Sequence, residues 1–554
     1  MPTVSAHVAV TLAEHVDHVF GVMGNGNAFF LDALERQTGA RFTAVRHEAG
    51  AVVAADTFHR ACGGLAAATT TYGAGFTNTL TALAEAVQAH VPLILVVGDE
   101  PTSGPRPWDV DQIAMASAVG ARTYTAGRAD AAATTVIAVE HALTYRVPTV
   151  LAIPYDVATL DAGPVPETPA PHLPEPLAPH GSFADGVVRE IAAALASARR
   201  PLLLAGRGAW VADAGKVLGA LADATGALTA TTALGRGVFP RPEYDLGVAG
   251  GFGADGAMAL VREADVAVVL GASLNQFTMR FGELFAPGTR VFQVDVAPAA
   301  THPHVGGYVR GDVAVVAESV LAELAELAVT SGAAPSGWRE SVDVAAALRR
   351  DPGEGVATDG RLDPRSAAAR LAELLPQDRV VVSDGGHFLG WSNMYWPVTS
   401  PDRMIMVGTA FQSIGLGLPS VVGAALARPD ATVVLTTGDG GGLMALADLE
   451  SAVRVAGGRG IAVVWNDGAY SAEVHLYGRK GLAREPMLIP DVDFAGVAGA
   501  LGAQGEVVRR VADLDVLAAW ATRPADERPF LLLDLRVSGA VVAPYWQEIV
   551  DQNT

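Results

Sequence analysis

The sequence has little cysteine, little lysine and no long apolar run. Its one cysteine among 554 residues, Cys62, excludes an internal disulfide and any cysteine-rich metal site. Lysine stands only at Lys216 and Lys480, which disfavours a Schiff-base mechanism. The apolar run at 91–99 is far shorter than the ~18 residues of a membrane span, and residues 1–20 lack the basic and apolar regions of a signal peptide. We therefore expect a soluble, cytoplasmic protein with no membrane partner.

Positive charge is scarce as well. Lys and Arg together number 38 against 59 Asp and Glu, which gives a formal net charge of -21. Nucleic acids and anionic membranes both need a basic surface, so neither is expected as a partner. Half of the residues are hydrophobic and only 18% are charged, which excludes a disordered chain. At roughly 150 residues per domain, the length predicts three or four domains.

Short apolar runs alternate with Ala- and Leu-rich stretches along most of the chain. Continuous apolar runs bounded by Gly or Asp are typical of parallel strands that are covered on both faces. The fold class is therefore α/β, with three doubly wound domains built on mainly parallel sheets. Pro- and Gly-rich segments at 161–182 and about 329–365 interrupt this alternation. We place a first domain at 1–160, a middle domain at 183–328 and a C-terminal domain at 360–554.

The C-terminal domain carries the most informative motif. An expected strand at 432–437 runs into Gly438-Asp439-Gly440-Gly441-Gly442 and then into an expected helix at 443–456. Glycines let backbone N–H groups approach a phosphate, and a carboxylate at the carboxyl end of a parallel strand lies where α/β sheets bind ligands. A second expected strand, at 461–465, ends in Asn466-Asp467. Oxygen ligands on adjacent strand ends suit a Mg²⁺ that also takes diphosphate oxygens.

This arrangement resembles the thiamine diphosphate-binding motif of the superfamily that includes acetolactate synthase, pyruvate decarboxylase and benzoylformate decarboxylase. The resemblance implies that Asp439 is the first Mg²⁺ ligand. A strict count of 27 residues from Asp439 makes Asn466 the second ligand. Aligning the stretch NDGAYSAE with the family's pattern instead chooses Asp467, together with the carbonyl of Ala469, and we favour that interpretation.

The N-terminal domain matches the same family independently. The stretch VRHEAGAVVAADTFHR places Glu48 before a helix, where the resemblance implies a hydrogen bond to the aminopyrimidine ring of the cofactor. That bond would favour the imino tautomer, whose nitrogen removes a proton from the thiazolium carbon. The alternative is a glutamate that serves only the helix dipole. The loop FGVMGNGNAFF and the stretch TTYGAGFTNTL, which contains Gly75 and Asn78, resemble further motifs of the family.

Other residues are identified by resemblance in the C-terminal domain. Ile414 falls where the family has a large apolar residue under the bent cofactor, with a plain core isoleucine as the alternative. Gln412 falls where a backbone carbonyl meets the ring amino group. Gly386 and His387 fall in the diphosphate-contact region, although a structural histidine would equally explain His387. His475 is a further candidate that has no clear counterpart in the family.

Residues expected above the thiazolium ring bear on the reaction type. Gln112 resembles the glutamine of acetolactate synthases and other carboligases, and Thr71 stands where benzoylformate decarboxylase has a pocket histidine. Glu473 matches the pocket glutamate of pyruvate decarboxylases, and is interpreted either as a general acid or as a surface helix residue. Asn25 and Asn27 in the GNGN loop would either bind a substrate carboxylate or carbonyl or form a turn.

The resemblance implies an acetolactate synthase-like carboligase that needs thiamine diphosphate and Mg²⁺ and acts on a 2-oxo acid or an acyloin. The alternatives are a simple 2-oxo acid decarboxylase that uses Glu473, a 2-hydroxyacyl-CoA lyase, and a non-catalytic paralogue. An intact Glu48 and Asp439 disfavour the paralogue, and the absence of a basic C-terminal segment disfavours the lyase.

The resemblance also bears on a second cofactor and on assembly. The middle domain resembles one that holds FAD in acetolactate synthases, but residues 273–283 lack the expected RFDDR pattern, which disfavours FAD. In the family the cofactor lies between the first domain of one subunit and the last domain of another. The resemblance therefore implies at least a homodimer, and commonly a homotetramer.

Overall fold

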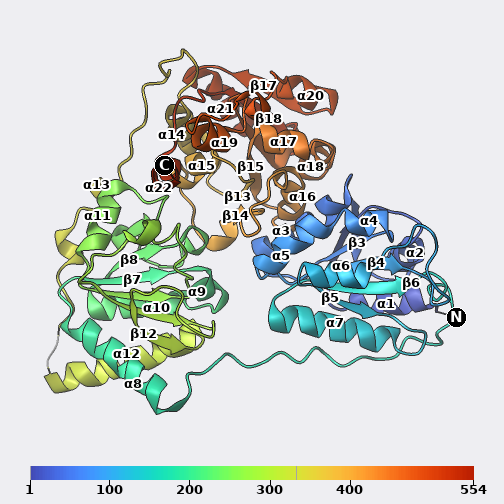
Figure 1. Cartoon of the computed structure of the whole chain (residues 1–554), viewed down its shortest axis with the longest axis horizontal. Coiled ribbons are helices and arrows are strands. Elements are labelled where there is room, and N and C mark those ends of the chain that lie inside the picture. Colours follow the sequence, from blue (N-terminus) through green and yellow to red (C-terminus); the bar gives the residue numbers. More distant parts are fainter. Residues whose placement is uncertain (1, 332–333, 554) are drawn as a thin grey trace.

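A computed structural model describes residues 2–331 and 334–553 of the chain. It contains three α/β domains, drawn blue, green and orange-red in Figure 1, and each is built on a six-stranded sheet. Every pairing between the named strands of the described residues is parallel. Helices flank the sheets, because strands that are apolar on both faces must be covered on both. The predicted α/β class with three doubly wound domains is confirmed.

The first domain has the strand order β2-β1-β3-β4-β6-β5. Its strands are β1 (His18–Gly21), β2 (Arg41–Ala44), β3 (Ala67–Thr70), β4 (Ile94–Asp99), β5 (Arg122–Thr125) and β6 (Thr149–Pro154). Its helices are α1 (Val4–Leu12), α2 (Ala28–Gln37), α3 (Glu48–Cys62), α4 (Ala74–Thr77), α5 (Leu80–Gln88), α6 (Gln112–Ala118) and α7 (Ala131–Tyr145).

The third domain repeats this order as β14-β13-β15-β16-β18-β17. Its strands are β13 (Arg379–Ser383), β14 (Met404–Met406), β15 (Thr432–Gly438), β16 (Gly460–Asn466), β17 (Gln504–Val508) and β18 (Leu531–Arg536). Its helices are α14 (Pro364–Leu374), α15 (Leu389–Tyr395), α16 (Gly417–Ala427), α17 (Asp439–Met444), α18 (Asp448–Ala456), α19 (Ser471–Glu473), α20 (Phe494–Ala500), α21 (Asp515–Ala521) and α22 (Pro544–Asn553). Short helical turns are η5 (Pro401–Arg403), η6 (Gly457–Arg459), η7 (Val474–Gly478), η8 (Glu485–Met487) and η9 (Val511–Leu514), of which η7 is a π-helix.

The middle domain is wound differently, with the order β12-β11-β10-β7-β8-β9, which is the order of dinucleotide-binding doubly wound folds. Its strands are β7 (Pro201–Ala205), β8 (Leu228–Thr231), β9 (Asp245–Val248), β10 (Val266–Leu270), β11 (Arg290–Asp295) and β12 (Val305–Arg310). Its helices are α8 (Gly181–Ser197), α9 (Arg207–Val211), α10 (Gly215–Thr225), α11 (Asp255–Glu263), α12 (Val313–Ser331) and α13 (Val344–Ala347), with 3₁₀ turns η1 (Ala233–Gly235), η2 (Pro242–Tyr244), η3 (Arg280–Gly282) and η4 (Arg339–Ser341).

Two extended segments connect the domains. Residues 162–180 contain no helix or strand and run along the lower edge of Figure 1 from the first domain to α8 of the middle domain. The second segment leads from α13 up to α14. Among the described residues, no helix is both long enough and apolar enough to cross a membrane.

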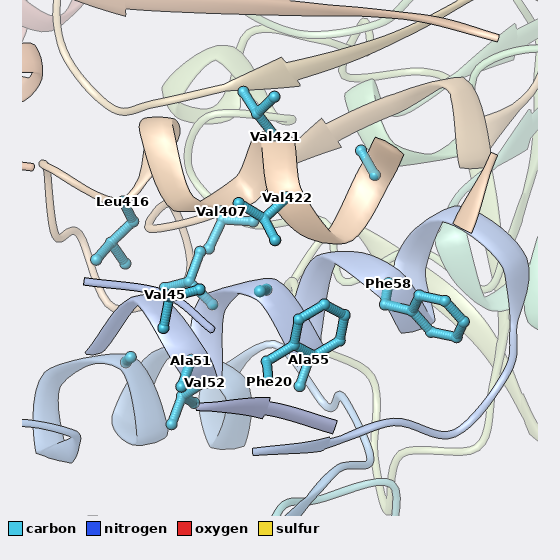
Figure 2. Close-up of a cluster of buried hydrophobic side chains, with 14 of the residues drawn as sticks. Phe20, Val45, Ala51, Val52, Ala55, Phe58, Val407, Leu416, Val421 and Val422 are labelled. Carbon is cyan, nitrogen blue, oxygen red and sulfur yellow. The ribbon is translucent and has the colours of Figure 1, made fainter. Parts of the chain in front are cut away.

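The first and third domains pack directly against each other through α3 and α16. Figure 2 shows α3 and α16 side by side, with Val422 of α16 pointing toward α3 and Val421 pointing away from it; these residues belong to one buried apolar cluster with Val52, Ala55 and Phe58 of α3. The approach is close, because a Cβ built at Gly423 would lie only 2.1 Å from the carbonyl oxygen of Ala54. Any larger residue at this helix crossing would push the two domains apart.

One local expectation is wrong. The sequence predicted a single helix at 443–456, but α17 begins at Asp439 and ends at Met444, and α18 begins again at Asp448. The carboxylate of Asp448 accepts hydrogen bonds from the Arg46 amide of the first domain, at 3.0 Å, and from the Ser451 hydroxyl. The direction of α18 therefore follows a contact between domains, and local sequence pattern does not reveal such a contact.

Candidate active site

Two carboxylates meet at the carboxyl ends of adjacent strands in the third domain. Asp439 follows β15 and is 3% exposed, and Asp467 follows β16. The carboxylate of Asp439 accepts hydrogen bonds from the amides of Gly440 (2.9 Å) and Gly468 (2.8 Å). Burial, and then repulsion from Asp467, raises the pKa of Asp439 to about 7. Burial raises the pKa of Asp467 to about 6.

The side chains of Asn466 and Asp467 go to different places. The amide of Asn466 donates to the carboxylate of Asp534 on β18, at 2.9 Å, and is buried inside the sheet. Asp467 instead accepts from the Ser471 hydroxyl and lies close enough to Asp439 for their charges to interact. The structure thus brings Asp467 to Asp439 and gives Asn466 a partner within the sheet. Ala469 follows in the same loop and forms an isolated bridge with Leu488.

A third carboxylate, Asp384, holds the loop that contains Gln412 and Ile414. Asp384 is 1% exposed and accepts hydrogen bonds from the amides of Gly415 (3.0 Å) and Leu416 (3.3 Å) and from the Thr437 hydroxyl. Burial raises the pKa of this carboxyl. The bonds tie the ends of β13 and β15 to the loop. Sequence analysis did not identify Asp384, although its place directly after an apolar strand matches that of Asp439.

The loop itself is strained and partly open. Gln412 is exposed and has a φ of +58°, a left-handed conformation that favours glycine. Ile414 is half-buried, and its side chain lies 3.2 Å from the position of a Cβ built at Gly385. The Phe411 amide donates to the carboxylate of Glu85 in the first domain, at 2.7 Å. The loop is therefore fixed at both ends, with its tip facing outward.

The C-terminal segment closes over Gly386 and His387. The hydroxyl of Tyr545 donates to the carbonyls of both residues, at 3.1 and 2.9 Å, and the Ala543 amide donates to Nε2 of His387 at 2.9 Å. Burial lowers the pKa of His387 to about 3, so the ring is neutral. Gly386 has a φ of +138°, a conformation that other residues rarely adopt. His387 thus has a structural partner, and sequence analysis did not find Tyr545.

His475 and Glu473 are two residues apart but differ in burial, with Glu473 at the end of α19 and His475 in η7. His475 is 7% exposed, its ring centroid lies 4.8 Å from that of His387, and its Nε2 has no hydrogen-bond partner among the described residues. Burial lowers the pKa of His475 to about 4. Glu473 is exposed and forms no side-chain hydrogen bond or ion pair with the described part of the chain. The following π-helix, η7, is a form that frequently accompanies functional sites.

The glycines around Asp439 are required by the chain's own packing. A Cβ at Gly440 would lie 2.5 Å from the Tyr470 ring, and one at Gly441 would lie 2.5 Å from the Asp384 carboxylate. A Cβ at Gly438 would lie 2.9 Å from the Phe388 ring. Sequence analysis explained these glycines by the approach of a phosphate. The structure adds that no side chain fits at any of the three positions without a shift in its neighbours.

In the first domain, Glu48 and Asn78 form a pair at the edge of the sheet. Glu48 is the first residue of α3, and its carboxylate accepts a hydrogen bond of 3.0 Å from the Asn78 amide. Gly75 lies beside them, and a Cβ there would be 3.5 Å from Glu48 and 2.5 Å from the Thr70 hydroxyl. Glu48 is half-buried and Asn78 is exposed. The family motif residues of this domain are therefore brought together on an accessible edge.

The two asparagines of the GNGN loop differ in burial and in their partners. Asn27 is 1% exposed, and its amide bonds Gly24, Val22 and Thr69 within the loop and the sheet. It forms the turn that sequence analysis gave as one alternative. Asn25 is exposed and donates to the Tyr72 hydroxyl at 2.8 Å.

Thr71 and Gln112 also form hydrogen bonds within the first domain. The Thr71 hydroxyl accepts from the Gly26 amide at 2.9 Å. Gln112 is 3% exposed, accepts from the Gly73 amide at 2.7 Å, and donates to the Gly98 carbonyl and the Asp99 carboxylate, both at 2.9 Å. Both amide atoms of Gln112 are thus bonded within the first domain, where they support the loop that leads to Asn78.

In the described part of the chain, Glu48 itself has no polar contact with the carboxylate pair of the third domain. No hydrogen bond or ion pair among the described residues links Glu48 to Asp439 or Asp467. No group of three or more His, Cys, Asp or Glu side chains in residues 2–331 and 334–553 is arranged to hold a metal ion. A metal at Asp439 and Asp467 would therefore need other oxygen ligands, such as a backbone carbonyl or those of a bound ligand.

The middle-domain loop at 273–283, which lacks the pattern expected for FAD, forms a contact with the third domain. Arg280 forms an ion pair with Glu548 of α22 in the third domain. Arg280 and Phe281 both have positive φ values, of +47° and +56°.

Comparison with known sequence families identifies three consecutive matches. Residues 2–119 match the family described as "Thiamine pyrophosphate enzyme, N-terminal TPP binding domain", and residues 188–324 match "Thiamine pyrophosphate enzyme, central domain". Residues 384–533 match "Thiamine pyrophosphate enzyme, C-terminal TPP binding domain". The three matches fall on the three six-stranded sheets in chain order.

Curated relatives align over almost the whole chain. A probable acetolactate synthase of Mycobacterium bovis is 30% identical over 94% of this chain and 91% of its own length. An acetolactate synthase of Mycobacterium avium is 27% identical over 96% of this chain and 86% of its own length. A sulfoacetaldehyde acetyltransferase of Alcaligenes xylosoxydans is 27% identical over 92% of this chain and 88% of its own length.

Proposed function

Because the chain belongs to the thiamine pyrophosphate enzyme family, we propose that it is a Mg²⁺-dependent carboligase of the acetolactate synthase type. Its donor substrate would be a 2-oxo acid or an acyloin, and its acceptor a second carbonyl compound. The names of the relatives, acetolactate synthase and sulfoacetaldehyde acetyltransferase, support an acyl-transferring reaction over simple cleavage.

The observation that carries this proposal is the carboxylate pair of Asp439 and Asp467. A buried carboxylate, Asp439, whose pKa is raised further by the neighbouring charge of Asp467, is unfavourable without a cation between the two. Their position at the ends of adjacent parallel strands is also where α/β sheets bind ligands. The pair therefore fits Mg²⁺, which is commonly held by one or two carboxylates together with phosphate oxygens. Asp439 and Asp467 would hold the metal, with the Ala469 carbonyl as the third protein ligand.

Thiamine diphosphate, when bound, supplies a nucleophilic carbon and an electron sink for breaking a bond beside a carbonyl. The chain's own residues orient it and move protons. Glu48 would hold and share a proton with the pyrimidine ring, and Asn78 orients the Glu48 carboxylate through its 3.0 Å hydrogen bond. Ile414 would support the bent form of the cofactor, on a loop that Asp384 and Glu85 hold in place.

The proposed enzyme works as a homodimer at least, and as a homotetramer if two such dimers associate. Support comes from Glu48, which has no polar contact with Asp439 or Asp467 in the described chain. A second copy would bring the Glu48 edge of one subunit to the Asp439 edge of the other. Each cofactor would then be enclosed by two subunits.

A second candidate function is supported by Glu473. This carboxylate is exposed and unpaired among the described residues, and it lies four positions after Ala469 in the chain. Such a group could protonate the carbon left after decarboxylation, which would release a free aldehyde. The buried and fully bonded amide of Gln112 gives this alternative further support, because it leaves no amide atom free for a substrate.

Product analysis separates the two functions. The purified enzyme is loaded with thiamine diphosphate and Mg²⁺ and given a panel of 2-oxo acids, each with and without an aldehyde or second 2-oxo acid as acceptor. The carboligase proposal expects acyloin or acetohydroxy acid products that require the acceptor. Free aldehyde as the sole product, with turnover lost in Glu473→Gln, would establish the decarboxylase instead.

A further inference from the structure

An arginine from the linker between the middle and third domains contacts the loop that carries Asp467. Arg361 lies in the segment that leads from α13 to α14. Its guanidinium donates to the backbone carbonyl of Asn466 at 3.0 Å and to that of Asp467 at 3.3 Å. These carbonyls stand where β16 ends and the loop toward Ala469 begins. One side chain thus bridges two successive carbonyls at the start of that loop.

The peptide group between Asp467 and Gly468 is held from both sides. Its carbonyl oxygen accepts from Arg361, and its amide donates to the carboxylate of Asp439 at 2.8 Å. A peptide group is planar, so two hydrogen bonds at its two ends fix its orientation. Gly468 has a φ of +79°, a conformation that lets the chain turn sharply before Ala469. Only one peptide group therefore separates Arg361 from the first proposed metal ligand.

The linker folds into a small hairpin that holds the backbone of Arg361. Within residues 355–363, the Ala357 amide donates to the Arg361 carbonyl at 2.8 Å. The Arg361 amide donates to the carboxylate of Asp359 at 3.0 Å. The turn of the hairpin contains Asp359 and Gly360, and Gly360 has a φ of +80°, as turns of this composition favour. The backbone of Arg361 is therefore fixed before its side chain makes any contact.

The hairpin is docked beside the strand that pairs with β16. Leu362 is completely buried and forms a parallel bridge with Val537, directly after β18. The Ser538 amide donates to the Leu362 carbonyl at 2.9 Å, and the Ser538 hydroxyl donates to Asp359 at 2.8 Å. Because β18 pairs with β16, this docking brings Arg361 to the end of β16.

Arg361 has two opposite effects on a cation at Asp467. A guanidinium carries five donors in a rigid plane, so it can fix two carbonyls at once. Its charge also reaches the Asp467 carboxylate: burial raises the pKa of Asp467 to about 6, and the Ser471 hydroxyl and then Arg361 act against that rise. A fixed loop favours metal binding, whereas a nearby positive charge opposes it. The direction of change on removing Arg361 therefore shows which effect is larger.

We propose that Arg361 is a positioning residue for the Mg²⁺ site, an inference that rests on the proposed function. Mg²⁺ requires nearly ideal octahedral geometry, with ligands at about 2.0–2.1 Å, and so tolerates displaced ligands poorly. Groups that orient metal ligands without touching the metal typically change its affinity by about 10–100-fold when they are removed. By fixing the peptide between Asp467 and Gly468, Arg361 keeps Asp467 and Ala469 in the positions proposed for metal ligands.

The first experiment measures how much Mg²⁺ the full-length protein needs to bind its cofactor. The affinity for thiamine diphosphate is determined by calorimetry at a series of fixed Mg²⁺ concentrations. Arg361→Met should need at least tenfold more Mg²⁺ for half of the maximal affinity. Arg361→Lys keeps the charge and some donors, and should recover part of this loss. Turnover at saturating Mg²⁺ should stay within about threefold of the wild type in both variants, because Arg361 orients a ligand and takes no part in the reaction.

Arg365→Met is the matched control. Arg365 lies four residues further along the same segment and forms ion pairs with Asp351 and Asp363, but it does not contact the loop at Asp467. Its replacement should lower the Tm and leave the Mg²⁺ requirement unchanged. An equal shift in Arg361→Met and Arg365→Met would reduce Arg361 to a general structural role and overturn the inference. An unchanged or lower Mg²⁺ requirement in Arg361→Met would overturn it as well.

Hydrogen exchange of the protein without cofactor and metal tests the same contact independently. Amides in residues 466–471 should exchange at least tenfold faster in Arg361→Met than in the wild type, and at the wild-type rate in Arg365→Met. Unchanged exchange in Arg361→Met would overturn this inference alone, even if the wild type binds thiamine diphosphate with Mg²⁺. Absence of any Mg²⁺-dependent binding in the wild type would instead overturn the proposed function together with this inference.

Discussion

The first and third domains have the same strand order but opposite chemistry at the carboxyl ends of their strands. In the third domain, Asp384 and Asp439 are 1% and 3% exposed and are held by backbone amides. In the first domain, Glu48 is half-buried and its partner Asn78 is exposed. One topology has thus produced a buried, charge-strained edge and an open, weakly bonded edge. The difference teaches that the carboxylates at the buried edge of the third domain need a cation to balance their charge. The open edge of the first domain, with Glu48, instead needs another protein surface to enclose a ligand.

The largest expected effect tests whether these edges are two halves of one site. Glu48→Gln and Asp439→Asn should each lower turnover by about 100-fold or more. They should fail differently: Glu48→Gln should keep Mg²⁺-dependent binding of thiamine diphosphate, and Asp439→Asn should lose it. Calorimetry with the cofactor, with and without Mg²⁺, distinguishes them.

Co-expression of these two variants sharpens the comparison further. If each site takes one edge from each subunit, a mixed dimer has one site with both changes and one intact site. Random pairing of the two chains should then restore about a quarter of wild-type activity. Co-expression of Glu48→Gln with Glu48→Ala is the control and should restore none. Failure of the first mixture to exceed the second would place both edges within a single chain.

The second prediction concerns the neighbours Asn466 and Asp467. Asp467→Asn should raise the Mg²⁺ concentration for half-maximal activity at least tenfold, because it removes a charge beside Asp439. Asn466→Ala should leave that concentration unchanged and lower the free energy of unfolding by about 1–3 kcal/mol, because it leaves the buried Asp534 short of a donor. Mg²⁺ titrations and urea unfolding of both variants check this. A Mg²⁺ shift in Asn466→Ala would reverse the assignment.

The third prediction follows from the burial of Asp439. Burial, and then repulsion from Asp467, raises the pKa of Asp439 from 3.8 to about 7. The folded protein therefore keeps a proton that the unfolded chain releases, and the stability from this group is lost as the pH rises from about 4 to about 7. Without cofactor, Asp439→Asn should thus become more stable than the wild type by about 1–2 kcal/mol at pH 8, and by less at pH 5.

Unfolding of both proteins by urea, at each pH and with Mg²⁺ absent, measures this difference. Subtracting the two curves is essential, because groups such as His387, whose pKa is lowered to about 3, contribute with the opposite sign. A constant difference across the pH range would show that Asp439 is ionised in the apo protein. Adding thiamine diphosphate and Mg²⁺ should stabilise only the wild type.

The fold could be predicted from sequence because several buried strands, such as β4 and β15, are largely apolar runs that end in Gly or Asp. Asp439 and Glu48 could be identified because their motifs are local and keep their spacing. Asp384, Glu85 and Tyr545 were missed, since each acts through backbone groups that are distant in sequence. Nothing in a local pattern shows that Gly415 lies beside Asp384. The choice between Asn466 and Asp467 also depended on which side chain turns into the sheet.

The smallest expected effect concerns two turns with nearly equal φ, one at each edge. Gly73 in the first domain has a φ of +59°, and Gln412 in the third has +58°. A residue with a side chain is strained by about 1 kcal/mol or more at such a φ. Replacing it with glycine removes this strain, but glycine also gives the unfolded chain more conformational freedom, which offsets part of the gain in stability. Gln412→Gly should therefore raise the free energy of unfolding by about 0.5–1 kcal/mol, whereas Gln412→Ala, which keeps the Cβ, should not. Because only the backbone of residue 412 would meet the cofactor, activity should be preserved in both variants. Loss of activity in Gln412→Gly, with the activity of Gln412→Ala unaffected, would mean that the strained turn itself positions the cofactor. The edge of the third domain would then keep this strain for function at the expense of stability.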